Sequence, residues 1–205
     1  FISGSGSGME AMVKAQRHLG LPHVTSVVVS NRASVEGLER AEKLGVPTLV
    51  VERGTGEAAL SREEHEMKLL DQLAPYNVEF IVLSGYMRLL SPVFLAEWEH
   101  RVVNIHPSLL PNFPGAHAHR DVLAANARLS GCTVHLVDDG MDTGAILAQS
   151  PVPVFSDDDE HSLSQRVKIE EHRLYPRVLT WIAEGRVHLT GDGLTVQGVE
   201  ARLVD

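Results

Sequence analysis

The sequence predicts an α/β protein: a single domain with an open, mostly parallel twisted sheet and helices on both faces. Strand and helix signals alternate along most of the 205 residues, as they do in chains built from βαβ units. Continuous apolar runs, such as the three valines at 27–29, are typical of strands covered on both faces. No internal repeat or low-complexity linker divides the chain, so we expect one domain over residues 1–205.

The N-terminal half opens on Phe1-Ile2, which we expect to be the end of a first strand that is truncated at the N-terminus. Glycines alternate with serines over residues 3–8 and predict a tight turn. Ser61 followed by Glu64 is a capping-box signature, which predicts that a helix begins there. The expected helices cover 9–19, 33–44 and 61–73, and the expected strands cover 24–30, 48–51 and 78–83.

In the C-terminal half, two prolines and a turn signal indicate where elements begin, bend or end. Pro92 suits the first turn of a helix, whereas Pro176 lies inside a long helical pattern that it should kink or divide. An irregular stretch, 108–118, follows the strand that leads to His106. Asp192-Gly193 predicts a small C-terminal β-hairpin. The expected helices cover 92–98, 120–127 and 162–183, and the expected strands cover 102–105, 132–137, 146–154, 187–189 and 194–196.

Composition excludes several classes of partner. The net charge is −9 and no run of five Lys or Arg occurs, so no nucleic acid is expected. No apolar run reaches the length of a membrane span and no signal-peptide pattern opens the chain, so no membrane partner is expected. Cys132 is the single cysteine, which excludes a disulfide framework and favours a cytoplasmic protein. We expect small-molecule substrates, and a monomer or homodimer.

The glycine-serine turn at residues 3–8 is the first candidate site. A glycine-rich turn between a strand and a helix exposes backbone N–H groups at the positive end of the helix, where phosphate binds well. Gly4, Gly6 and Gly8 lack the spacing of the dinucleotide fingerprint, and no lysine follows as in a P-loop. The alternative is a flexible, linker-like turn.

Two further loops belong to the same predicted edge, beyond the carboxyl ends of the strands. Asn104 and His106 are two residues apart on a strand and therefore face the same side. An asparagine can donate to a developing oxyanion, and a histidine can transfer a proton near neutrality. The acidic loop 138–144 could place an aspartate opposite the histidine and favour its protonated form. The alternatives are a structural histidine and a solvated acidic turn.

Metal binding and nucleophilic catalysis are weaker interpretations. His106, His117 and His119 lie close in sequence, but the loop between them is long, so no metal is expected. Ser108 lacks the Gly-x-Ser-x-Gly elbow. Cys132 lies in an apolar strand and is expected in the core rather than as a nucleophile.

Five blocks of the sequence, in the right order and over nearly the whole chain, resemble the glycinamide ribonucleotide formyltransferase family of purine biosynthesis. They are ISGSGS at 2–7, GYMRLLSP at 85–92, NIHPSLLP at 104–111, PG at 114–115 and MDTG at 141–144. The third block is quite specific to folate-dependent formyl transfer. The resemblance implies a Rossmann-like formyltransferase fold. It also implies transfer of a formyl group from 10-formyltetrahydrofolate, a co-substrate, to the amine of glycinamide ribonucleotide.

The resemblance also implies roles for individual residues. Asn104 would bind the formyl oxygen, His106 would act as acid and base, and Asp142 would hold the histidine protonated and order a water. The residues implied in binding the phosphate and ribose are Gly6, Ser7, Gly8, Met9, Glu10 and Glu171, and those implied in binding folate are Arg62, Met87, Arg88, Leu89, Leu90 and Asn104. Two positions depart from the family. Gly8 stands where asparagine is common, and Lys168 stands where glutamine is often found.

Two alternatives remain open. The first is a hydrolase that releases formate from formyltetrahydrofolate, and the phosphate-binding turn counts against it because water carries no phosphate. The second is a folate- or nucleotide-binding regulatory domain without catalysis. The joint presence of Asn104, His106 and Asp142 counts against the second.

Overall fold

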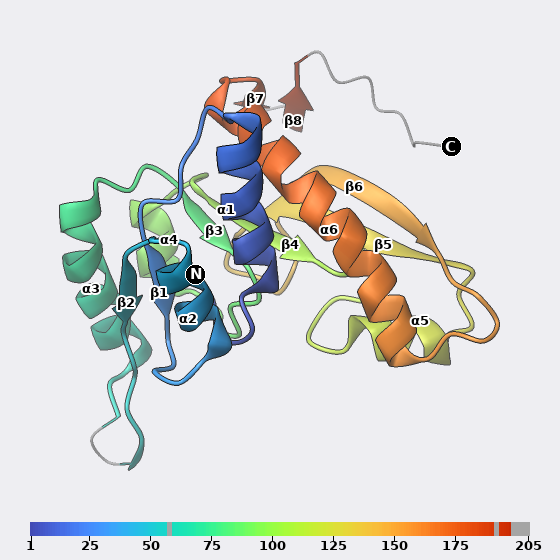
Figure 1. Cartoon of the computed structure of the whole chain (residues 1–205), viewed down its shortest axis with the longest axis horizontal. Coiled ribbons are helices and arrows are strands. Elements are labelled where there is room, and N and C mark those ends of the chain that lie inside the picture. Colours follow the sequence, from blue (N-terminus) through green and yellow to red (C-terminus); the bar gives the residue numbers. More distant parts are fainter. Residues whose placement is uncertain (57–58, 191–192, 198–205) are drawn as a thin grey trace.

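The computed structural model describes residues 1–56, 59–190 and 193–197 and confirms the α/β class (Figure 1). A twisted sheet lies at the centre, and helices pack against it. Its strands are β1 (Val28–Ser30), β2 (Thr48–Val50), β3 (Ile81–Leu83), β4 (Val102–His106), β5 (Leu129–Leu136) and β6 (Ile146–Pro153). β1 pairs with β2 and β3 pairs with β4 in parallel, while β5 runs antiparallel to both β4 and β6.

Residues 1–3 connect the two parallel pairs. The Ile2 N–H donates to the Val29 carbonyl at 2.9 Å, and Ile2 forms a parallel bridge with Ser30. On the other side, the Ser84 N–H donates to the Phe1 carbonyl at 2.9 Å. These residues therefore lie between β1 and β3, where the sequence predicts the end of a first strand.

Two predicted strands are shorter than expected by three residues or more. Residues 24–27 and 78–80 precede β1 and β3 but are not part of them. A strand requires a neighbour for its backbone N–H and C=O groups. Within the described part of the chain, residues 24–27 and 78–80 form no ladder with another strand.

The helices confirm several local signals. They are α1 (Ser7–Leu19), α2 (Glu36–Lys43), α3 (Arg62–Leu73), α4 (Pro92–Glu97), α5 (Ala118–Ala124) and α6 (Glu160–Ala183), with a short 3₁₀ turn, η2 (Ala74–Tyr76). The Ser61 hydroxyl accepts from the Glu64 N–H at 3.1 Å, and the Glu64 carboxylate accepts from the Ser61 N–H at 2.7 Å, so the capping box is formed. α6 is not divided at Pro176, because burial of that turn against the sheet offsets the lost backbone hydrogen bond.

Alternating side chains of the strands supply both faces of the sheet. Val103 packs with α1 and α6, whereas its neighbour Val102 packs with α3 and α4. In the same way Val28 packs with α1 and α2, and Val29 packs with α3. This period of two places buried side chains on opposite faces, so helices cover both faces as the sequence predicts.

The predicted C-terminal hairpin is present as β7 (Val187–Thr190) paired antiparallel with β8 (Gly193–Val196). Asp192, in its predicted turn, lies outside the described residues. In the described ranges, no helix combines the length and apolar character needed to cross a membrane.

Candidate active site

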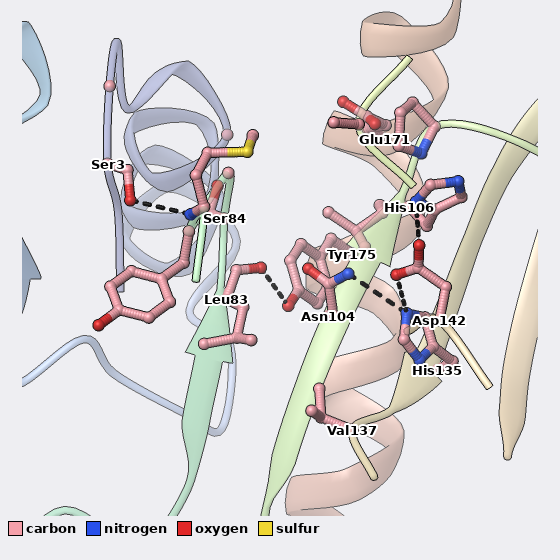
Figure 2. Close-up of a pocket in the computed structure, with 18 of the residues that line it drawn as sticks. Ser3, Leu83, Ser84, Asn104, His106, His135, Val137, Asp142, Glu171 and Tyr175 are labelled. Carbon is pink, nitrogen blue, oxygen red and sulfur yellow. Dashed lines mark hydrogen bonds and ion pairs between the residues drawn. The ribbon is translucent and has the colours of Figure 1, made fainter. Parts of the chain in front are cut away.

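A cleft of about 600 Å³ lies where β3 and β4 end, at the edge predicted for ligand binding (Figure 2). It is lined by the glycine-serine turn, the segment after β3, the end of β4, the acidic loop and one face of α6. The predicted site residues that line it are Gly6, Ser7, Gly8, Met87, Arg88, Leu89, Leu90, Asn104, His106, Asp142 and Glu171. Met9, Glu10 and Arg62 do not line it, and their roles in binding stay predictions.

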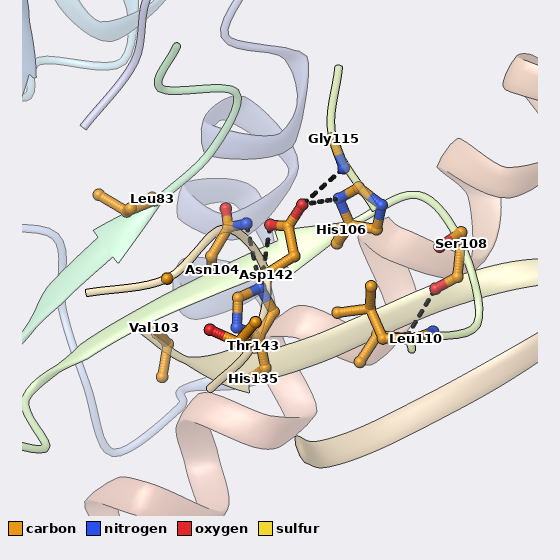
Figure 3. Close-up of polar contacts among 12 residues, drawn as sticks. Leu83, Val103, Asn104, His106, Ser108, Leu110, Gly115, His135, Asp142 and Thr143 are labelled. Carbon is orange, nitrogen blue, oxygen red and sulfur yellow. Dashed lines mark hydrogen bonds and ion pairs between the residues drawn. The ribbon is translucent and has the colours of Figure 1, made fainter. Parts of the chain in front are cut away.

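His106 and Asp142 meet in this cleft (Figure 3). The distance from His106 Nδ1 to Asp142 Oδ2 is 3.3 Å, and the two side chains are only 5% and 13% exposed. The other ring nitrogen of His106, Nε2, lies 2.9 Å from the Phe113 carbonyl oxygen. Both nitrogens thus face hydrogen-bond acceptors, an arrangement that suits the doubly protonated imidazolium.

The Asp142 carboxylate is held from three directions. Its Oδ2 accepts a hydrogen bond from the Gly115 N–H at 2.8 Å, which ties the acidic loop to the irregular stretch after β4. A hydrogen bond from His135, the Gly115 N–H and the charge of His106 hold the pKa of Asp142 below its usual value of 3.8, against the effect of burial. Asp142 has φ 56°, a left-handed conformation that aspartate tolerates better than most residues. The carboxylate is therefore ionised at neutral pH.

His135 belongs to this group, although none of the sequence motifs includes it. It lies on β5 directly opposite Asn104. Its Nε2 is 3.2 Å from Asn104 Nδ2 and 3.6 Å from Asp142 Oδ1. Its Nδ1 is 2.8 Å from the Leu136 carbonyl oxygen, so Nδ1 carries a proton, and Nε2 faces both the Asn104 amide and the Asp142 carboxylate. The second amide hydrogen of Asn104 remains available to the cleft. The signal in the sequence was a histidine within the mostly apolar segment 132–137, where a strand is predicted.

We expect His135→Ala to lower kcat by about tenfold or more, because a small misplacement of reacting groups can cost about 100-fold. The substitution removes the contacts of the His135 ring with the Asn104 amide and with the Asp142 carboxylate, so neither group is held in position by this residue. KM for either substrate should change little, because His135 only positions these residues. Steady-state kinetics with His18→Ala as the control, an exposed histidine of α1 outside the cleft, measures the effect. A wild-type kcat in His135→Ala would contradict this role.

Ser108 makes structural hydrogen bonds, and Cys132 lies in the core as the sequence predicts. The Ser108 hydroxyl donates to the Asn112 carbonyl at 2.6 Å, and the Thr133 hydroxyl donates to the Ser108 carbonyl at 2.6 Å. These bonds shape the irregular stretch that carries Gly115. Cys132 is fully buried, and burial raises the pKa of its thiol. In the residues described, no three His, Cys, Asp or Glu side chains are grouped closely enough to hold a metal ion.

The glycine-serine turn forms the opposite end of the cleft. α1 begins at Ser7, two residues earlier than predicted, after Gly6 in a left-handed conformation with φ 67°. A Cβ on Gly6 would lie 2.6 Å from the Gly37 Cα, so glycine is required there. The first N–H to reach a helical acceptor is that of Glu10, which donates to the Gly6 carbonyl at 2.9 Å. The N–H groups before it are left open at the positive end of α1.

Hydrogen bonds of Ser3 attach this turn to the segment after β3. The Ser3 hydroxyl donates to Asn31 Oδ1 at 2.7 Å and accepts from the Met87 N–H at 2.9 Å. In that segment the side chains of Met87 and Leu89 are exposed beside the cleft, whereas Leu90 is buried. Exposed apolar side chains at a cleft edge suit a flat, largely apolar ligand.

Three residues that the sequence predicts to bind substrate or folate lie outside the cleft. Met9 is buried in the core with α2. Glu10 pairs with Lys14 at 2.6 Å and with Arg40, and these hydrogen bonds lower its pKa. Arg62 is exposed at the first turn of α3.

α6 contributes Lys168, Glu171 and Tyr175 to the cleft. Burial raises the pKa of Glu171 to about 7, and the charge of Lys168 acts in the opposite direction. The Tyr175 hydroxyl donates to the Leu83 carbonyl at 2.8 Å, which fastens α6 to the end of β3. Lys168 and Arg88 are the lysine and arginine among the lining residues, and both are without a carboxylate partner in the described part of the chain.

Comparison with known proteins gives a consistent result. A sequence model of the formyl transferase family matches residues 1–179. The chain is 46% identical over 186 residues to the trifunctional purine biosynthetic protein adenosine-3 of Drosophila pseudoobscura pseudoobscura, covering 90% of this chain but only 13% of that protein. It is 38% identical over 197 residues to phosphoribosylglycinamide formyltransferase of Escherichia coli (strain K12), covering 96% of this chain and 92% of the relative.

Solved structures agree with these relatives. Glycinamide ribonucleotide transformylase 1 from Symbiobacterium toebii superposes with a TM-score of 0.89 at 40% identity, covering 95% of this chain and 91% of that one. Phosphoribosylglycinamide formyltransferase from Brucella melitensis superposes with a TM-score of 0.84 at 47% identity, covering 92% and 95%. These structures cover most of this chain, and the residues matched by the family model include those that line the cleft.

Proposed function

This chain belongs to the formyl transferase family, and we propose that it transfers a formyl group from 10-formyltetrahydrofolate to the amine of glycinamide ribonucleotide, a step of purine biosynthesis. The observation that carries the proposal is one cleft with two ends. An amide, an imidazole and a carboxylate converge at one end, and an open helix N-terminus lies at the other. The phosphoribosylglycinamide formyltransferase of Escherichia coli, which the chain matches over nearly its full length, supports it.

The sugar substrate would bind between the glycine-serine turn and α6. Its phosphate would accept hydrogen bonds from the open N–H groups of Ser7 and Gly8, where the helix dipole favours an anion. Glu171 lines the same cleft and would accept hydrogen bonds from the ribose hydroxyls. The ammonium group of Lys168 offsets the added negative charge, a difference from the glutamine that the family often has there.

The folate would bind along the segment after β3. Met87 and Leu89 present exposed apolar side chains to the cleft, which suit the faces of an aromatic ring system. This placement would bring the formyl group over the end of β4, beside Asn104.

The reaction would then be a direct transfer. The amine lone pair attacks the formyl carbon, a C–N bond forms, and the carbonyl oxygen becomes an oxyanion. Asn104 donates its free amide hydrogen to this oxyanion and protonated His106 stabilises it, where losing one such donor costs about 3 kcal/mol of barrier. Collapse of the intermediate breaks the bond to the folate N10, and the amine proton reaches that nitrogen through His106 and a water molecule. The products are formylglycinamide ribonucleotide and tetrahydrofolate.

Turnover by the purified protein tests this proposal. We expect the folate absorbance to change only when both substrates are present. Release of formate from 10-formyltetrahydrofolate without the sugar substrate would instead identify a hydrolase. Folate binding without turnover of either kind would identify a regulatory domain.

Removing the phosphate from the sugar substrate is expected to raise KM by about 10- to 100-fold, because each hydrogen bond to a charged group contributes about 1.5–3 kcal/mol. Inorganic phosphate should compete with the phosphorylated substrate and not with the folate. Initial rates over a range of both substrates measure these effects. Equal KM values for the phosphorylated and dephosphorylated sugars would contradict a phosphate site at the turn.

A further inference from the structure

A side chain that neither the sequence motifs nor the proposed mechanism uses lies beside the glycine-serine turn. Ser84 follows β3 and lines the cleft together with Gly8. A Cβ atom built on Gly8 would lie 2.6 Å from the Ser84 Oγ and 3.9 Å from its Cβ. The first of these distances is too short for a real Cβ contact. The Ser84 hydroxyl therefore fills the space that a side chain on residue 8 would take.

The Ser84 hydroxyl is available to a ligand. The backbone N–H of Ser84 donates to the Phe1 carbonyl at 2.9 Å, which holds the residue in place at the end of β3. Its Oγ makes no hydrogen bond to any other residue of the described ranges, and the side chain is only half-buried. By contrast, Ser3 on the same turn is buried and uses its hydroxyl for two structural hydrogen bonds.

The hydroxyl also lies where an anion would be bound. Gly8 is the second residue of α1, so its N–H is among those left open at the helix start. An oxygen within contact distance of the residue-8 Cβ position is therefore next to these N–H groups. A hydroxyl can rotate its hydrogen toward a ligand oxygen, and the two kinds of donor can converge on one phosphate.

We propose that Ser84 is a substrate-binding residue, whose Oγ donates to the phosphate of the sugar substrate from the position that a side chain on residue 8 would occupy. This inference rests on the proposed function, which supplies the phosphorylated substrate. It accounts for the glycine at position 8, since a larger residue there would displace the hydroxyl. Residues 8 and 84 thus act as a pair: Ser84 provides the hydrogen-bond donor, and the absence of a side chain on Gly8 leaves space for it.

Ser84→Ala should raise KM for glycinamide ribonucleotide by about tenfold, the value of one hydrogen bond to a charged group. The kcat and the KM for 10-formyltetrahydrofolate should not change, because the contact is the same in the ground and transition states. KM for the dephosphorylated sugar should also stay at the wild-type value. Ser34→Ala, an exposed serine outside the cleft, is the matched control. An unchanged KM for the phosphorylated sugar in Ser84→Ala would overturn the inference.

Gly8→Ala tests the pair from the other side. The new methyl group pushes the Ser84 hydroxyl away, so this variant should raise KM as much as Ser84→Ala does. Added to Ser84→Ala it should have no further effect, and Gly8→Asn with Ser84→Ala should recover most of the affinity through the new amide. Alanine is favoured over glycine in a helix, so the thermal midpoint should not fall. Additive effects of Gly8→Ala and Ser84→Ala would contradict the pairing.

Calorimetric titration with ribose 5-phosphate separates this inference from the proposed function. It reports the phosphate contact without turnover, and Ser84→Ala should weaken binding by the same factor as in the kinetics. If the wild-type protein turns over neither substrate but Ser84→Ala still weakens the binding of ribose 5-phosphate, the proposed function fails and the role of Ser84 stands. If the wild-type protein turns over both substrates but wild type and Ser84→Ala bind ribose 5-phosphate equally well, the proposed function stands and the role of Ser84 fails.

Discussion

His106→Ala is expected to lower kcat by about 10³-fold, within the range that a positioned acid–base group contributes. The variant loses the group that stabilises the oxyanion and relays the proton to the folate nitrogen. The Asp142 carboxylate would also be left beside the reacting atoms without the charge it faces at 3.3 Å. KM for both substrates should change far less than kcat. Absorbance of the folate product under saturating substrates measures the loss.

Controls for His106→Ala must separate chemistry from folding. His106 is buried, so removing its ring leaves a cavity and the thermal midpoint should be measured beside the rate. His106→Asn fills more of that space and keeps a hydrogen-bond donor, but it cannot relay a proton near neutrality. We expect it to be folded and nearly as slow as His106→Ala. A kcat within a few-fold of wild type in either folded variant would remove the proposed mechanism.

Asp142→Asn is expected to lower kcat by about 100-fold or more, because a neutral amide cannot stabilise the imidazolium that forms during proton transfer. The amide keeps the shape of the carboxylate, so the variant tests charge rather than packing. Asp142→Ala should be at least as slow. Initial rates near neutral pH, with both substrates saturating, measure the effect. Wild-type turnover in folded Asp142→Asn would show that the charge has no part in the reaction.

The same substitution predicts a pH dependence of stability. Since the pKa of Asp142 in the folded protein lies below the ordinary value of 3.8, ionised Asp142 stabilises the native state above that value. This contribution is lost as the pH falls through the lowered pKa of the folded state. The free energy of unfolding of wild type should therefore exceed that of Asp142→Asn at neutral pH, and the difference should shrink in acid. Urea denaturation at several pH values, with Asp121→Asn on the partly exposed surface of α5 as the control, tests this.

Much of the fold could be predicted from the chain alone, because its signals are local. The capping box at Ser61 and the glycine turn before α1 depend on residues only a few positions apart. The apolar runs at β1 and β3 are local too, although the extent of these strands was overestimated. Strand length depends on a pairing partner, and a partner is distant in sequence.

Within the cleft, the sequence by itself determined that Asn104 and His106 share a face, since this follows from the period of a strand. Only the tertiary structure decided that His135 stands opposite Asn104, because the register of β5 on β4 depends on packing across residues 31 positions apart. The contact between Gly8 and Ser84 likewise arises where a helix start meets the end of β3. Residue types and local spacing specify which groups are present, and long-range packing specifies which of them meet.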